Sequence, residues 1–188
     1  MSHDHLDDAL IEKAKKIKLL ILDIDGVCTD GKLYFNDAGE CMKVFHSHDG
    51  LGIRLAQKGG IDVAIISARQ SEAVVNRMKA LGVEYIYQGY HNKCLAYEEL
   101  LDILDLKPEA VAYLGDDLPD MQVMQQSGLG IAVANAANCV KRIADIETAK
   151  CGGHGAVREV CAMLLSAQDK LDHVIAPFYS KTVWIINN

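Results

Sequence analysis

A short apolar run that ends in two aspartates constrains this chain more than any other feature. Residues 19–27 read LLILDIDGV, and such an apolar run is typical of a buried β-strand. Alternate side chains of a strand point the same way, so Asp23 and Asp25 can reach one point at its carboxyl end, where Gly26 allows a sharp turn. Asp-Gly after a strand is also common turn chemistry. However, two carboxylates at one point repel each other unless a cation lies between them or one is protonated. The run therefore indicates a site for a divalent cation and a phosphoryl group.

The composition narrows the classes of protein to which the chain can belong. The 188 residues carry a formal net charge of −7 without a stripe of lysines or arginines, which disfavours nucleic acid and anionic membranes as partners. Residues 1–8 lack the basic and then apolar order of a signal peptide, and no apolar run approaches the ~20 residues of a membrane span. We therefore expect a single cytoplasmic domain over residues 1–188, with its six scattered cysteines unpaired.

Strand and helix patterns alternate along the chain. Buried strands are predicted over residues 18–24, 62–66, 84–87, 110–114 and 129–133, and helices over residues 6–17, 51–58, 71–81, 95–104, 121–126 and 156–171. Apolar strands separated by helices form a mostly parallel sheet that is covered on both faces. The sequence therefore predicts a three-layer, doubly wound α/β fold of the Rossmann type, in which ligands bind beyond the carboxyl ends of the strands.

Two further segments fall outside this alternation. Residues 32–35 and 41–45 are strand patterns joined by a Gly-containing loop at 36–40, which predicts a β-hairpin insertion over about 32–45. A C-terminal tail of about 173–188 follows the final helix and is rich in apolar and aromatic residues. This tail either packs on its own subunit or covers a neighbouring one.

Polar side chains follow the other predicted strands. Ser67 comes after the second strand, Lys93 after the third, and Asp116, Asp117 and Asp120 after the fourth. Each alone has an ordinary explanation as a helix cap, a solvated side chain or a turn residue. Together they would bring a hydroxyl, an ammonium and a second group of carboxylates to the rim that holds the first two aspartates.

In their order along the chain, these motifs resemble those of the haloacid dehalogenase superfamily of phosphatases. The matching segments are Asp23-x-Asp25-Gly, Ser67, Lys93 and Gly115-Asp116-Asp117-x-x-Asp120. The chain more narrowly resembles the 3-deoxy-D-manno-octulosonate 8-phosphate phosphatases, through LLILDIDGVCTDG, FxxxDG at 45–50, YQG at 87–89, VAYLGDD at 111–117 and GGxGAVREV at 152–160. The resemblance covers nearly the whole chain, and it implies a hydrolase that removes phosphate from an acid sugar phosphate in lipopolysaccharide biosynthesis.

The resemblance also implies roles for the side chains at the rim. Asp23 is the expected nucleophile that becomes an aspartyl phosphate, and Asp25 the expected acid and base for the leaving alkoxide and the attacking water. Ser67 would donate a hydrogen bond to the phosphoryl oxygens. Lys93 would neutralise those oxygens and the nucleophile.

Magnesium is the cofactor that the resemblance implies, and a hard cation with oxygen ligands suits these residues. The implied ligands are the side chains of Asp23 and Asp116 and the backbone carbonyl of Asp25. Asp117 and Asp120 are expected just outside, where they would orient waters or Lys93.

No cap domain is expected over this rim. The stretch from Asp25 to Ser67 is used up by a hairpin, a helix and a strand, and the stretch from Lys93 to Gly115 by a helix and a strand. The resemblance implies that a neighbouring subunit supplies the lid, in a homo-oligomer that is expected to be a tetramer built through the hairpins.

Several residues are candidates for binding the sugar acid. Arginine offers a bidentate fork that suits a carboxylate. The candidates are Asp25, Arg69, Arg77, Arg158, His48, Asp49 and Gly50. His48, His154 and Ala68 depart from the pattern of the family, which has arginine, arginine and glycine there.

Other functions stay open at this point. A phosphatase for a nine-carbon keto acid phosphate or a broad sugar phosphatase would share the same motifs. A receiver domain has a similar sheet, but its accepting aspartate follows the third strand, where this chain has none. A non-catalytic module that has kept the fold is the remaining alternative.

Overall fold

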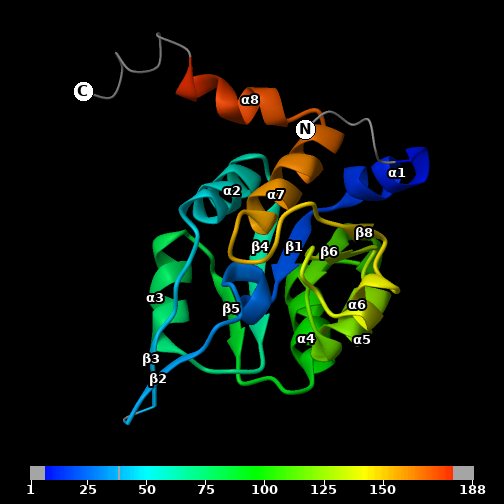
Figure 1. Cartoon of the computed structure of the whole chain (residues 1–188). Helices are drawn as coiled ribbons and strands as arrows, with labels where there is room; N and C mark the ends of the chain where they lie inside the picture. The colour runs from blue at the N-terminus through cyan, green and yellow to red at the C-terminus, as the bar shows by residue number, and fades with distance from the viewer. Residues whose placement is uncertain (1–6, 38, 180–188) are drawn as a thin grey trace.

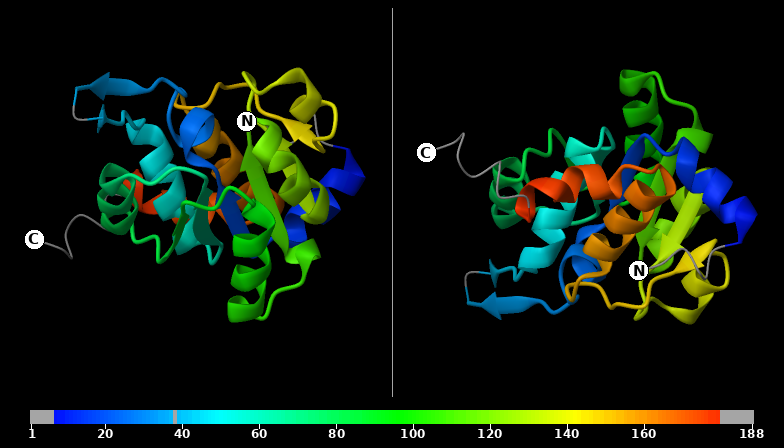
Figure 2. Two further views of the ribbon diagram at one scale, coloured as in Figure 1. Left: turned by 90° about the horizontal axis from the view of Figure 1, so that it is seen from below. Right: turned by 90° about the horizontal axis from the view of Figure 1, so that it is seen from above.

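The computed structural model describes residues 7–37 and 39–179 (Figure 1). Its main element is a six-stranded parallel sheet in the order β5-β4-β1-β6-β7-β8. The strands are β1 Leu19–Leu22, β4 Asp62–Ser67, β5 Tyr85–Gln88, β6 Val111–Gly115, β7 Leu129–Ala132 and β8 Ile146–Glu147. Helices cover both faces of the sheet (Figures 1 and 2), so the predicted doubly wound α/β fold is confirmed.

The helices pack on the sheet in two groups. Their bounds are α1 Asp8–Lys16, α2 Ser47–Lys58, α3 Glu72–Ala80, α4 Lys93–Leu104, α5 Met121–Gln126, α6 Asn138–Lys141, α7 Ala156–Ala167 and α8 Leu171–Ile175. Helices α2 and α7 pack together on one side, and α4 and α5 on the other (Figure 2). Short helical turns are η1 Ile24–Cys28, η2 Pro108–Ala110, η3 Leu118–Asp120 and η4 Ala176–Phe178. Among the described residues, no helix is both long and apolar enough to cross a membrane.

Strand β1 lies at the centre of the sheet because it has nothing but apolar side chains. All four of its residues are buried. Its register sets Leu22 beside Ile65 of β4 and Leu114 of β6, so the three strands end side by side. The residues that follow β1, β4 and β6 therefore meet at one rim.

The predicted hairpin forms, with strands β2 Tyr34–Asn36 and β3 Gly39–Met42. Its turn is tighter than the predicted 36–40 loop, because Asn36 already pairs with Gly39 and the pairing is irregular between Tyr34 and Phe35. The hairpin projects from the body of the molecule (Figure 1). Among the described residues, only this hairpin and α2 lie between η1 and β4, and only α4 and η2 lie between β5 and β6, so this part of the chain forms no cap domain over the rim.

Two helices begin earlier than predicted because their N-caps went unrecognised. Helix α2 begins at Ser47, where His46 Nδ1 accepts the backbone N–H of His48. Helix α4 begins at Lys93 itself, since the side chain of Asn92 accepts the N–H of Cys94. A capping side chain satisfies the free amides of a first turn, so α2 begins four residues and α4 two residues earlier than predicted.

The prediction of one final helix over residues 156–171 is wrong. Helix α7 ends at Ala167, and α8 begins only at Leu171. Gln168 instead donates its side-chain amide to the carbonyls of Ala14 and Ile17, which caps α1. Asp169 then adopts a positive φ of 55°, which ends the helical path.

Two elements are too short to have been read from periodicity, namely α6 and β8. The predicted tail of about 173–188 is described only as far as Tyr179, through α8 and η4. Its remaining residues, 180–188, lie outside the described residues.

Candidate active site

Asp23 stands directly after β1, at the centre of the rim. It is buried and extended, and the chain then turns through η1 with a φ of 96° at Gly26. Such a φ favours glycine. A Cβ at Gly26 would also lie 2.0 Å from Asp116 Oδ2, so only glycine allows the turn after β1 to approach the turn after β6 this closely.

Lys93 links Asp23 to the loop after β6. Its ammonium, with a side chain only 3% exposed, lies 2.7 Å from Asp23 Oδ1 and 2.6 Å from Asp120 Oδ1. Tyr113 of β6, also buried, donates its hydroxyl to the same oxygen of Asp120 at 2.7 Å. Burying one cation between two carboxylates is favourable only with such complete hydrogen bonding. Sequence reasoning missed Tyr113, because its place in an apolar strand marks it only as a core residue.

Asp120 also organises the turn that carries Asp116. Its second oxygen, Oδ2, accepts the backbone N–H groups of Asp116 at 2.9 Å and of Asp117 at 3.2 Å. Asp117 is exposed, and its own carboxylate caps η3 by accepting the N–H of Leu118. Asp117 therefore lies outside the group of carboxylates, whereas Asp120 lies inside it.

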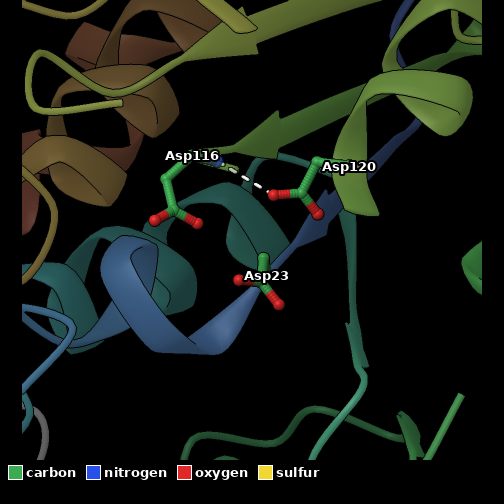
Figure 3. A group of neighbouring side chains, drawn as sticks. All are labelled: Asp23, Asp116 and Asp120. Atoms are coloured by element: carbon green, nitrogen blue, oxygen red, sulfur yellow. Dashed lines mark hydrogen bonds between the residues drawn. The ribbon is translucent and has the colours of Figure 1, made fainter. Parts of the chain in front are cut away.

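Three carboxylates converge where a cation would fit. Asp23, Asp116 and Asp120 each offer an oxygen, and these oxygens lie within 4.8 Å of one another (Figure 3). Burial, together with the negative charges of Asp23 and Asp120, raises the pKa of Asp116 to about 8. Burial also raises the pKa of Asp23, to about 6, although Lys93 opposes this. A divalent cation would stabilise the charged forms and relieve the repulsion.

The hydrogen bonds distinguish the three carboxylates as ligands. Both oxygens of Asp120 are already occupied by four donors. Asp23 keeps one oxygen that Lys93 does not hold, and the Asp116 carboxylate has no hydrogen-bond partner among the described residues. Carboxylate oxygens are what magnesium prefers. The donor set therefore fits Mg²⁺, with Asp23 and Asp116 as the available side chains.

Asp25 faces a second group of charges, on the side of the hairpin. Its Oδ1 accepts a hydrogen bond from Lys43 at 2.5 Å, and Arg69 Nε lies 3.6 Å from its Oδ2. The Arg69 guanidinium also lies over the ring of Phe35. Ser67, at the end of β4, is buried, and its oxygen accepts the N–H of Arg69 at 3.3 Å. Sequence reasoning did not single out Lys43.

The remaining candidates lie among the helices instead. Asp49 is buried, and its Oδ1 accepts the backbone N–H of Arg158 in the first turn of α7. Gly50 packs under Arg77, since a Cβ there would lie 2.3 Å from Nη2 of that arginine. His48 is exposed, with its ring against His46. Within residues 7–37 and 39–179, no hydrogen bond or ion pair joins these candidates to Asp23, Asp25, Lys93 or Asp116.

The chain matches known proteins over most of its length. A family model of haloacid dehalogenase-like hydrolases matches residues 83–159. The 3-deoxy-D-manno-octulosonate 8-phosphate phosphatase KdsC of Escherichia coli (strain K12) is 50% identical over 163 residues, which is 87% of each chain.

Solved structures agree with these matches. The crystal structure of the 3-deoxy-D-manno-octulosonate 8-phosphate phosphatase from Yersinia pestis has a TM-score of 0.87 and 47% identity, covering 89% of this chain and 90% of that one. The enzyme of that name from Moraxella catarrhalis, solved with magnesium, phosphate and KDO, has a TM-score of 0.89 and 41% identity, covering 93% and 99%. The chain belongs to the haloacid dehalogenase-like hydrolases, in the family of the 3-deoxy-D-manno-octulosonate 8-phosphate phosphatases.

Proposed function

We propose that this protein is a magnesium-dependent phosphatase that hydrolyses 3-deoxy-D-manno-octulosonate 8-phosphate to the free sugar acid and phosphate, as a single domain in lipopolysaccharide biosynthesis. The observation that carries the proposal is the buried Asp23, held by Lys93 at 2.7 Å at the end of β1. Relatives with half of their residues identical bear the name of this activity.

Asp23 is the nucleophile in this proposal. Lys93 lies beside its Oδ1, and one carboxylate oxygen attacks phosphorus while the other would hold the cation. The bond from Asp23 to phosphorus forms as the bond from phosphorus to the sugar oxygen breaks. Lys93 neutralises the carboxylate and the phosphoryl oxygens, and the Ser67 hydroxyl donates to those oxygens. These charges stabilise a transition state in which negative charge spreads over the transferring group.

Asp25 moves the proton. It gives one to the departing sugar oxygen, and then takes one from the water that cleaves the aspartyl phosphate. The side chains of Asp23 and Asp116 and the backbone carbonyl of Asp25 would hold the magnesium ion. When bound, the ion neutralises phosphoryl oxygens as a Lewis acid.

Arg69 is the best placed of the candidates for the substrate carboxylate. It lies beside Asp25, and 42% of its side chain is exposed. Arg77, Arg158, His48, Asp49 and Gly50 stay predictions as substrate-binding residues, since their contacts described above lie between helices.

The hairpin supports a homo-oligomer, for which a tetramer is the expected size. Four large apolar side chains are exposed on the hairpin insertion, namely those of Leu33, Phe35, Met42 and Val44. Apolar side chains gathered on one projecting element favour contact with another surface. A neighbouring hairpin would cover them and close the uncapped rim. The cytoplasmic location stays a prediction.

A comparison of sugar phosphates by kcat/KM tests the proposal. The octulosonate 8-phosphate should exceed glucose 6-phosphate by roughly 100-fold or more, because a group built to bind a carboxylate discriminates strongly when that partner is missing. EDTA should remove activity, and magnesium should restore it. Equal kcat/KM values across the set would contradict the proposed substrate specificity. A higher kcat/KM for a nine-carbon keto acid phosphate would identify that compound as the substrate instead. A lack of hydrolysis of every ester with magnesium would contradict the reaction itself.

A further inference from the structure

Lys43, next to the hairpin, has a buried side chain, whereas Lys32 at the start of the hairpin is exposed. It follows β3, and its neighbours Met42 and Val44 are 49% and 51% exposed. The Lys43 side chain itself is only 3% exposed. Burying an ammonium costs free energy unless charged or polar partners compensate for the lost water. A specific partner must therefore draw this side chain inward.

That partner is the Asp25 carboxylate, and it is held at one oxygen. Lys43 Nζ lies 2.5 Å from Oδ1. The other oxygen, Oδ2, is buried and accepts no hydrogen bond within the described chain. Arg69 Nε lies 3.6 Å from Oδ2, which is too far for a hydrogen bond. The two oxygens of one carboxylate therefore differ, since Oδ1 is anchored by Lys43 and Oδ2 is buried without a hydrogen bond.

We propose that Lys43 is a positioning residue for Asp25, which fixes Oδ1 so that Oδ2 exchanges the proton with the leaving group and the water. The proposal rests on the proposed phosphatase function and deepens it. It also ties the hairpin to the chemistry, because the position of Lys43 depends on how the hairpin sits on the rim.

The proton balance follows from this geometry. In the first step the proton on Oδ2 passes to the sugar oxygen, as the bond from that oxygen to phosphorus breaks and Asp23 binds phosphorus. In the second step water attacks phosphorus, Oδ2 takes its proton, and the bond from Asp23 to phosphorus breaks. Lys43 keeps its own protons throughout.

Lys43 acts most strongly while the proton leaves Oδ2. Negative charge then develops on a carboxylate whose other oxygen lies beside the ammonium. An interaction that strengthens in the transition state raises the rate of the step. A sugar alkoxide is a poor leaving group that needs this proton, whereas p-nitrophenolate leaves without one. The two kinds of ester therefore separate positioning of Asp25 from support of the fold.

The test compares Lys43→Met with the wild type in single turnovers, with enzyme in excess, so that only the first step is timed. With octulosonate 8-phosphate the first step should slow by roughly 100-fold, the range of lost general acid catalysis. With p-nitrophenyl phosphate it should slow by less than about threefold, because proton transfer contributes little there. The phosphoenzyme, followed by mass, should then decay at the same rate whichever ester formed it.

Lys32→Met is the matched control, since Lys32 lies at the start of the same hairpin, is 70% exposed and pairs with Asp30. It should leave both esters unchanged, and Lys43→Arg should restore part of the loss. If Lys43→Met does not fold, Lys43→Gln keeps a donor without the charge and should show the same selective loss.

Equal slowing of the two esters, or unchanged rates with both, would overturn the role of Lys43. If the wild type hydrolyses neither ester, the proposed phosphatase function fails instead, so the two failures are distinguishable.

Discussion

The rim of the sheet and the hairpin differ in which side chains they bury and which they expose. At the rim, polar groups are buried, and several find partners within the chain, as Lys93 does between Asp23 and Asp120. On the hairpin, apolar groups such as Phe35 and Met42 are exposed. The rim holds the carboxylates and the lysine that the proposed reaction uses, whereas the hairpin presents a surface that a second copy could cover. Substrate access would thus depend on the hairpin more than on the rim.

The pairing of the strands explains this difference. Most rim residues follow β1, β4 and β6, whose relative positions are held by ladders on both sides of β1, and Lys93 follows β5. Within the described part of the chain, the hairpin strands pair only with each other. A two-stranded ribbon is marginal in water without further packing. One contact that joins it to the rim is the buried ion pair of Lys43 with Asp25.

The largest effect should come from the rim. Asp23→Asn should lower turnover of every ester by at least ~10⁴-fold, because the amide cannot attack phosphorus. The fold should persist, since the amide oxygen can still accept the Lys93 hydrogen bond. Turnover and circular dichroism of the variant check both points. Activity well above background would mean that the rim does not carry the reaction as one unit.

A change on the hairpin should act on assembly and substrate access. Met42→Glu would bury a charge if hairpins pack together, so sedimentation should show smaller species and KM for the sugar acid phosphate should rise several-fold. Turnover of p-nitrophenyl phosphate should change by less than about threefold, because the rim is untouched. Ile103→Glu, at an equally exposed position on α4, is the control. Unchanged sedimentation and KM would mean that the hairpin takes no part in assembly or in substrate access.

The smallest effect concerns Asp49, which lies in α2, the helix that follows the hairpin, and bonds to α7. Burial raises its pKa from the ordinary value of 3.8, so the folded protein binds this proton more tightly than the unfolded chain. Its contribution to stability is therefore largest at acid pH and is lost as pH rises through the raised pKa.

Asp49→Asn cannot titrate, and its amide oxygen can still accept the Arg158 N–H. The free energy of unfolding of the variant should thus rise relative to that of the wild type as the pH increases from 4, by at most about 1.4 kcal/mol per pH unit. Urea unfolding at several pH values measures this difference, with exposed Asp102→Asn as the control. A constant difference would mean that the Asp49 carboxyl is not destabilised by burial.

Much of the rim was predictable, because strand ends can be read from apolar runs. The central run before Asp23 and the polar residues after β4 and β6 follow local patterns. Lys43, by contrast, is one lysine in a hairpin, and only the three-dimensional path of that hairpin brings it to Asp25. The break after α7 was equally hidden, since it depends on Gln168 capping a helix at the other end of the chain.

The four hydrogen bonds of Asp120 have a consequence for how this protein can vary. The single side chain of Asp120 both binds Lys93 and fixes the turn that carries Asp116. Asparagine would turn one acceptor into a donor, and glutamate would displace the carboxylate by one methylene. A substitution of Asp120 would therefore disturb the position of Lys93 and the turn at Asp116 together. Its neighbour Asp117, which only caps a helical turn, is much freer to change.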